Sequence, residues 1–207
     1  YYEMLSVTSD GQVLLRRAAD HIDGRPAYRQ VRRYTLCHVC DGEDMGALRD
    51  IGGLKLRRQT ADIRVETPAY WQLSRYNDFA SGKHLTINGV PDRTYYRKQI
   101  LRIDFPALEG TEGAAPTVAL LMNEVFRTLF AENADYITAV APAAEQPYIT
   151  HTLDCTAVEE PPINGLYIIE DSPMDIGLLV AVERNLSRIF YILCDYLDWH
   201  LAALEES

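Results

Sequence analysis

The stretch Gly165-Leu166-Tyr167-Ile168-Ile169-Glu170-Asp171-Ser172-Pro173-Met174-Asp175 decides the fold, because it joins the clearest strand pattern of the chain to the longest helical pattern. The run 165–169 is apolar and β-branched, which is typical of a strand covered on both faces. Ser172 and Pro173 then supply a helix start, with a hydroxyl cap and a proline in the first turn. Apolar side chains recur at steps of three and four from residue 176 to residue 204, which predicts one long amphipathic helix.

The second half of the chain has the pattern of a layer of helices over a small sheet. Residues 117–130 carry a broad apolar stripe at helical spacing, and residues 135–140 and 148–153 have strand patterns. We expect the stripes of the two helices to meet over the strand 166–169.

The first half is mainly antiparallel β-structure. Strand patterns flank the turn residues 9–11, and residues 54–58 and 61–66 predict the two strands of another hairpin. The aromatic segment 69–79 is either a helix on the sheet or an exposed aromatic loop. The predicted fold class is therefore α+β, with an antiparallel β-rich first half followed by a small sheet under two long amphipathic helices.

A boundary is predicted at residues 106–116, which are rich in glycine and alanine and contain two prolines. It separates a β-rich basic lobe at 1–107 from an α/β scaffold lobe at 117–207. The alternative is one compact domain in which 106–116 is only a linker.

The composition favours a folded protein without membrane spans. Apolar residues make up 47% of the 207 residues and charged residues 24%, and no apolar run reaches the roughly 20 residues that a membrane helix needs. The four cysteines are too sparse for a secreted disulfide framework, so we expect a reducing, cytoplasmic location and no membrane partner.

Charge is divided unevenly along the chain. Residues 1–105 hold 17 lysines and arginines against 13 acids, whereas residues 106–207 hold 3 against 17. The first half could contact a polyanion or an acidic protein surface, or the two halves could neutralise each other. Clustered arginines next to tyrosines are what nucleic acid attracts, and the predicted nucleic-acid contacts are Arg16, Arg17, Arg25, Arg29, Arg32 and Arg33.

The cysteine spacing raises the possibility of zinc. Cys37 and Cys40 form a Cys-x-x-Cys pair that is followed by a glycine, as in a zinc knuckle. His151 and Cys155 would complete a four-ligand set. The alternative is that these cysteines are reduced and structural.

Several enzyme classes lack their signature motifs. There is no Gly-x-x-x-x-Gly-Lys-Ser/Thr loop and no Gly-x-Gly-x-x-Gly turn, so no nucleotide cofactor is expected. One catalytic candidate remains: Glu170, Asp171 and Asp175, with Asp104 or Asp154, could hold magnesium for phosphodiester hydrolysis. The competing interpretation is that these acids cap and stabilise the helix start.

The segment 166–178, a strand that ends in an acid and leads through a small-residue turn to Gly-Leu and a long helix, resembles a known domain. It is similar to the accessory C-terminal domain, of the zinc-binding type, of large bacterial DEAD/DEAH-box helicases and of helicase-associated phage-defence proteins of the DISARM type. The similarity covers about residues 117–204. It implies a non-catalytic module that supports a DNA-translocating motor by binding DNA or docking on the motor domains.

The first functional hypothesis is therefore a non-catalytic accessory module of a helicase-like or phage-defence protein, contacting nucleic acid or a motor domain in the same chain or complex. A metal-dependent phosphodiesterase that uses the acidic turn is the first alternative. A protein-interaction subunit without nucleic-acid contact, using the aromatic segment 70–79, is the second.

Overall fold

The computed structural model describes residues 2–7, 13–17, 28–40, 47–72, 83–87, 92–108, 110–111, 113–143, 149–162 and 164–205. The strands are β1 (Tyr2–Val7), β2 (Val13–Arg17), β3 (Tyr28–Val39), β4 (Arg49–Ile51), β5 (Leu54–Gln72), β6 (Lys83–Thr86), β7 (Arg93–Asp104), β8 (Ile137–Val140), β9 (His151–Asp154) and β10 (Leu166–Glu170). The helices are α1 (Ala114–Leu129), α2 (Leu178–Arg184) and α3 (Leu186–Glu205), with short 3₁₀ turns at η3 (Pro106–Leu108) and η4 (Ala134–Tyr136).

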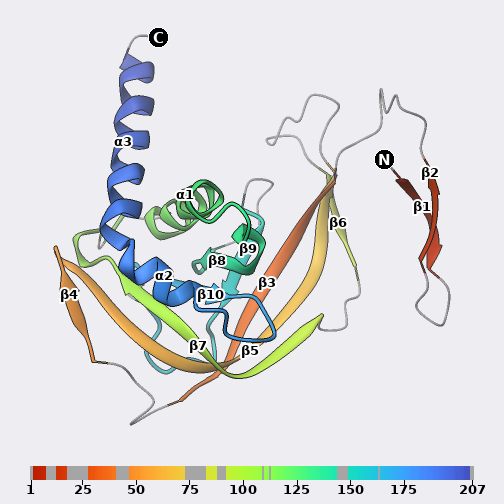
Figure 1. Cartoon of the computed structure of the whole chain (residues 1–207), viewed down its shortest axis with the longest axis horizontal. Helices are drawn as coiled ribbons and strands as arrows, with labels where there is room; N and C mark the ends of the chain where they lie inside the picture. The colour runs from red at the N-terminus through yellow and green to blue at the C-terminus, as the bar shows by residue number, and fades with distance from the viewer. Residues whose placement is uncertain are drawn as a thin grey trace.

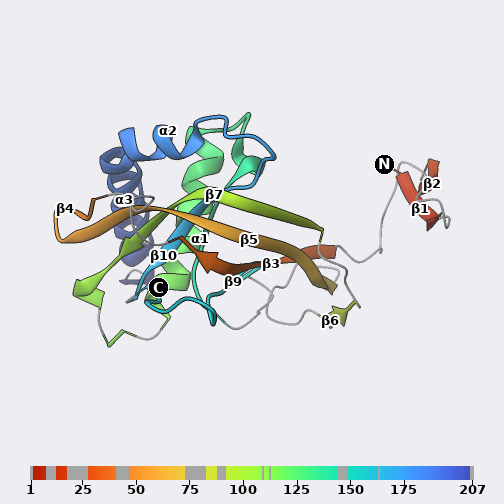
Figure 2. The same ribbon diagram turned by 90° about the horizontal axis from the view of Figure 1, so that it is seen from below.

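One large sheet carries the fold, in the order β8-β10-β7-β5-β3-β9, with β4 and β6 paired to β5. The pairs are antiparallel except β3 with β9, which run parallel. The sheet is strongly curved, and its two end strands β8 and β9 lie beside each other (Figures 1 and 2). The sheet therefore has an inner face and an outer face. The predicted α+β class is confirmed.

The inner face is an apolar core to which six strands contribute. Side chains alternate along a strand, so every second residue points inward. The inward residues are Tyr34, Leu36, Ala61, Ile63, Val65, Tyr95, Ile100, Val140, Leu153, Tyr167 and Ile169, each at most 8% exposed. Since these residues come from both halves of the sequence, the core forms only when both halves fold together.

The three helices cover the outer face of the sheet at β8, β10 and β7. The apolar stripe of α1 buries Ala119, Met122 and Phe126, and α2 and α3 pack beside it over Leu166 and Ile168 of β10. The predicted meeting of the two stripes over this strand is confirmed. The fully buried apolar run of β10 is explained by its position between an inner core and a helical layer.

Three local predictions were wrong. The helix expected from residue 173 begins at Leu178, because the carboxylate of Glu170 accepts the backbone N–H groups of Ile176 and Leu178 and so fixes the preceding loop. The chain then breaks at Asn185, giving two helices in place of one. The segment 54–72, expected to contain a hairpin, is the single long strand β5.

The predicted boundary at 106–116 falls between β7 and α1, and strands on both sides of it belong to the same sheet. β10 pairs with β7 and β9 pairs with β3, so the second half completes the sheet of the first. The first hairpin, β1 with β2, is a separate two-stranded sheet. Among the described helices, none combines the length and the apolar character that a membrane span requires.

Candidate functional site

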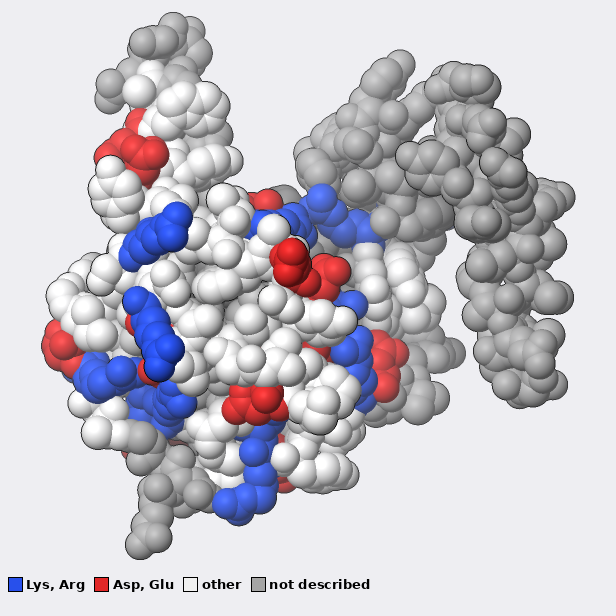
Figure 3. All heavy atoms as spheres, in the orientation of Figure 1, with Lys and Arg blue, Asp and Glu red and all other residues white. Residues whose placement is uncertain are grey.

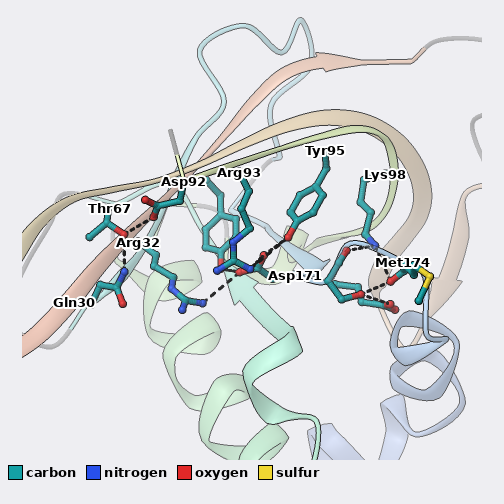
Figure 4. A network of polar contacts seen from close by, with 12 residues as sticks. Gln30, Arg32, Thr67, Asp92, Arg93, Tyr95, Lys98, Asp171 and Met174 are labelled. Carbon is teal, nitrogen blue, oxygen red and sulfur yellow. Dashed lines mark hydrogen bonds and ion pairs between the residues drawn. The ribbon is translucent and has the colours of Figure 1, made fainter. Parts of the chain in front are cut away.

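The acidic turn after β10 is the first candidate, and its central residue is Asp171. This carboxylate is only 1% exposed at the inner face of the sheet. Its Oδ1 accepts a hydrogen bond from Tyr95 Oη at 2.7 Å and from Arg93 Nη1 at 3.1 Å. Its Oδ2 accepts from Tyr34 Oη at 3.0 Å and from Arg32 Nη1 at 3.3 Å. Figure 4 shows the labelled side chains of Arg32, Arg93 and Tyr95 directed toward Asp171.

The electrostatics of this cluster keep both phenols protonated. Burial raises the pKa of Tyr34 far above its usual value, and the negative charge of Asp171 raises it further. Burial also raises the pKa of Tyr95, and its hydrogen bond to Asp171 acts in the same direction. Both phenols therefore remain donors to Asp171, and two arginines balance its charge. We call this buried carboxylate and its four donors, Arg32, Tyr34, Arg93 and Tyr95, the Asp171 clamp. Its role is structural, since it ties β3, β7 and the turn after β10 together.

Glu170 and Asp175 also have structural partners. Glu170 is 1% exposed, and besides the two amides before α2 it accepts a hydrogen bond from Ser172 Oγ at 3.3 Å. Lys98 Nζ donates to the carbonyl oxygen of Ser172 at 2.9 Å and holds the same loop. Asp175 Oδ1 accepts the amide of Gly177 at 3.0 Å. The N-cap of α2 is Gly177, without a side-chain cap hydrogen bond, so Asp171 and Ser172 do not cap this helix. Glu170 and Asp175 instead hold the loop that leads into it.

The structure does not gather the acids proposed for metal-dependent hydrolysis. Asp104 is paired with Arg102 Nε at 2.9 Å, and Asp154 accepts hydrogen bonds from Thr156. Within the described residues, no group of three or more histidine, cysteine or acidic side chains is arranged to hold a metal ion. The phosphodiesterase alternative stays a prediction.

The four residues predicted to bind zinc lie along β3 and β9. Cys37 is exposed and Cys40 is buried at the end of β3. His151 is paired with Arg32, five residues before Cys37 along the strand, a separation of about 16 Å in extended chain. Zinc ligands lie about 2.0–2.3 Å from the metal, so His151 does not fit a site with Cys37 and Cys40. Elemental analysis of the purified protein tests the zinc prediction directly.

The arginines predicted to contact nucleic acid are distributed over several environments. Arg25 lies outside the described residues, as do the side chains of Arg16 and Arg17 on β2. Arg33 on β3 pairs with Glu66 at 3.3 Å. The other two, Arg29 and Arg32, line a groove beside α1 that the sequence did not reveal.

This β3–α1 groove has a cavity volume of about 260 Å³ and lies where β3, β8 and β9 approach α1. Three arginines contribute to it, Arg29 and Arg32 from β3 and Arg127 from the polar side of α1. Its remaining lining residues are Gln30, Leu120, Asn123, Glu124, Ala134, Asp135, Ile137, Thr138, Thr150 and His151. Arg127 is one of only three cations in residues 106–207, which is the sequence signal that could have drawn attention to it.

The groove combines three arginines with two acids, Glu124 and Asp135. The pKa of Arg29 is lowered by burial and then by the charge of Arg127. Burial lowers the pKa of His151 to about 4, and the charges of Arg32 and Arg127 act in the same direction. His151 is therefore neutral at pH 7, and its Nδ1 lies 3.2 Å from Thr150 Oγ1. Three guanidinium groups in one groove can donate hydrogen bonds to an anion.

Other charges of the two halves neutralise each other. Arg58 and Arg49 from the first half both contact Glu183 of α2, at 2.6 Å and 3.0 Å. Figure 3 shows basic and acidic side chains side by side on the visible face of the described residues, with no continuous basic surface. The basic first half and the acidic second half thus partly neutralise each other within the fold, and this includes Arg32 of the β3–α1 groove, which pairs with Asp171.

Fold and site together define an α+β module: a curved sheet, clamped at one end of its inner face by a buried carboxylate and backed by helices, with an arginine-lined groove at its side. No model of a known protein family matches the chain. No curated protein matches it either.

Among solved structures, the chain is similar to the crystal structure of the DUF1998 helicase MrfA bound to DNA. The sequence identity is 8% and the TM-score is 0.45, and the match covers 91% of this chain and 23% of that one. The chain thus spans about a quarter of the length of that protein. At this level the likeness assigns neither a family nor a function.

Proposed function

We propose that this chain is a non-catalytic accessory module of a helicase-like protein, and that it contacts the phosphate backbone of nucleic acid in the β3–α1 groove. The observation that supports this most strongly is the convergence of Arg29, Arg32 and Arg127, from two separate elements, on one groove. Guanidinium groups bind phosphate oxygens with paired hydrogen bonds, and several together favour a polyanion over a single anion.

The existing partners of Arg32 and Arg127 leave room for a phosphate. Arg127 pairs with Glu124 at 2.8 Å, but the two side chains are 64% and 55% exposed, and such a pair contributes little free energy. Arg32 has 28% of its side chain exposed while it holds Asp171. A phosphate can therefore recruit Arg127 at small cost and approach Arg32 without breaking its bond to Asp171.

The motor-associated role comes from the sequence. The resemblance of residues 117–204 to the accessory domain of DEAD/DEAH-box helicases supports a place beside a motor. We extend the same proposal to a role in phage defence and to a location in the cytoplasm. The absence of a triphosphate-binding loop from the sequence fits a module that does not drive translocation itself.

The test is binding of a fluorescently labelled single-stranded DNA over a series of salt concentrations. We expect the double variant Arg29→Gln/Arg127→Gln to lose about tenfold or more in affinity, and the slope of log K against log salt to become shallower by about 1 to 1.5. The matched control is Arg184→Gln/Arg188→Gln, which removes the same charge from two exposed positions. Equal affinity losses in both double variants, or none in either, would overturn the proposal.

A second candidate function is docking on a protein partner, and it is favoured by α3. The C-terminal part of this helix projects from the body in Figure 1. Along its length the helix exposes large apolar side chains: Tyr191 is 72% exposed, Trp199 65% and Leu201 58%. Of the segment first suspected, Tyr70 and Trp71 lie on β5 and are only partly exposed, and residues 73–82 lie outside the described residues. Large exposed apolar and aromatic side chains are typical of an interface.

A further inference from the structure

A second cavity lies at the inner face of the sheet, at the end away from the Asp171 clamp. This β5 pocket has a volume of about 320 Å³. It is lined by His38, Val39, Arg57, Gln59, Ala157, Val158, Glu159 and Glu160. Its volume is at the lower end of the range for small-molecule sites, which suits a fragment-sized ligand.

The wall formed by residues 157–160 is held in place by an arginine. Arg102 of β7 donates to the carbonyl oxygens of Glu160 at 2.7 Å and Pro161 at 3.2 Å, and its Nε also bonds Asp104. The register places Arg102 directly opposite Arg57 on β5. Arg102 therefore holds the pocket wall and Asp104 through its three side-chain nitrogens, whereas Arg57 faces the cavity.

Within the part of the chain that the structure describes, Arg57 and Gln59 carry buried polar atoms without a hydrogen-bond partner. Gln59 is 3% exposed, and its Oε1 makes no hydrogen bond. The Nε of Arg57 is buried and also lacks an acceptor. Buried groups of this kind are destabilising when unsatisfied, so their presence side by side in one cavity indicates a ligand that satisfies them.

The ligand has to match a specific pattern of donors and acceptors. Arg57 requires an acceptor, Gln59 Oε1 requires a donor, and the carboxylates of Glu159 and Glu160 can only accept when ionised. Guanine carries acceptors at O6 and N7, which suit arginine, and donors at N1 and N2 on the adjacent edge. We propose that the β5 pocket binds an unstacked guanine base of a single-stranded nucleic acid.

The same pattern disfavours other ligands. Two carboxylates at the wall repel a phosphate group, so the base enters and its phosphate stays outside. Adenine offers no pair of ring and exocyclic donors on one edge for the carboxylates. This inference rests on the proposed function, since it names a base that the phosphate-binding module would select.

The direct test uses the nucleoside without a polymer. Guanosine, adenosine, cytidine and uridine are titrated against the whole chain by ligand-observed NMR or calorimetry. Guanosine should bind at least about tenfold more tightly than the other three, and guanosine monophosphate should bind more weakly than guanosine. Equal affinities, preference for another nucleoside, or no saturable binding would overturn the assignment.

Two variants separate the pocket from folding. Arg57→Met and Gln59→Leu remove the unsatisfied atoms while keeping side-chain volume, so both should retain the stability of the wild type or exceed it. Each should lose at least about tenfold in guanosine affinity. Lys55→Met, at an exposed position of the same strand, is the matched control and should bind guanosine as the wild type does. Unchanged guanosine affinity in both pocket variants would contradict the proposal.

An oligonucleotide comparison distinguishes the failure of this inference from the failure of the proposed function. A thymidine oligomer with one central guanine should bind more tightly than the plain thymidine oligomer, and Arg57→Met should abolish only that difference. If both oligomers bind equally with a steep salt dependence, the guanine pocket fails and the β3–α1 groove stands. If neither oligomer binds at low salt, the proposed function fails.

Discussion

Arg58 of β5 donates two hydrogen bonds to the carboxylate of Glu183 in α2, from Nε at 2.6 Å and from Nη2 at 3.1 Å. The two residues are 125 positions apart in sequence. The hydrogen bond to Glu183 and its negative charge raise the pKa of Arg58. The pair joins the outer face of the sheet to the helical layer, and it shows how a basic first half and an acidic second half are combined in one fold.

Replacing Glu183 by Gln should destabilise the protein by about 1 kcal/mol, because Arg58 and Arg49 lose their shared charged acceptor. Arg58 keeps 35% of its side chain exposed, so water compensates for part of the loss. Urea unfolding measures the difference. Glu124→Gln, in an exposed pair on α1, should change the free energy of unfolding by less than about 0.5 kcal/mol, and a similar loss in both variants would argue against the role of Glu183.

His151 should make stability depend on pH. Its folded-state pKa of about 4 lies below the usual 6.5, so the unfolded chain takes up a proton first as the pH falls. The contribution is fully present above pH 6.5 and is lost between about pH 6.5 and about pH 4. Between pH 7 and pH 4.5 the wild type should therefore lose about 2 kcal/mol more than His151→Gln in urea unfolding. Parallel pH profiles of the two proteins would contradict this.

Trp199 tests the second candidate function. The side chain of Trp199 is 65% exposed. Trp199→Ser should therefore change the free energy of unfolding by no more than about 0.5 kcal/mol and shift the thermal unfolding midpoint only slightly. It should also lower the binding of an apolar dye such as bis-ANS, which reports exposed apolar surface. A large drop in the midpoint would show that the residue packs inside the fold.

Local patterns were sufficient to predict the layers of the fold. The stripe on α1 and the apolar run of β10 each depend on side chains a few residues apart, and both elements were found where the sequence placed them. The start of α2 was missed because its amides are satisfied by Glu170, eight residues before Leu178, and not by a residue at the helix terminus. The curvature that brings β8 beside β9 depends on the whole sheet and has no short-range signature.

The site residues were harder to predict because their partners are remote in sequence. Tyr34 and Asp171 are 137 positions apart, and no spacing rule connects them. Arg57 and Gln59 were missed for another reason, since β5 was taken as two strands. Had the alternation of Ala61, Ile63 and Val65 been continued toward the N-terminus, it would have placed both polar side chains on the inner face.

The most direct test of the structural role of the acidic turn is the urea unfolding of Asp171→Asn. The amide retains the size of the carboxylate but leaves Arg32 and Arg93 without a buried counter-charge, so we predict a loss of about 3 kcal/mol in the free energy of unfolding. An unfolding free energy equal to that of the wild type, accompanied by the loss of a magnesium-dependent phosphodiesterase activity that the wild type possesses, would contradict the account.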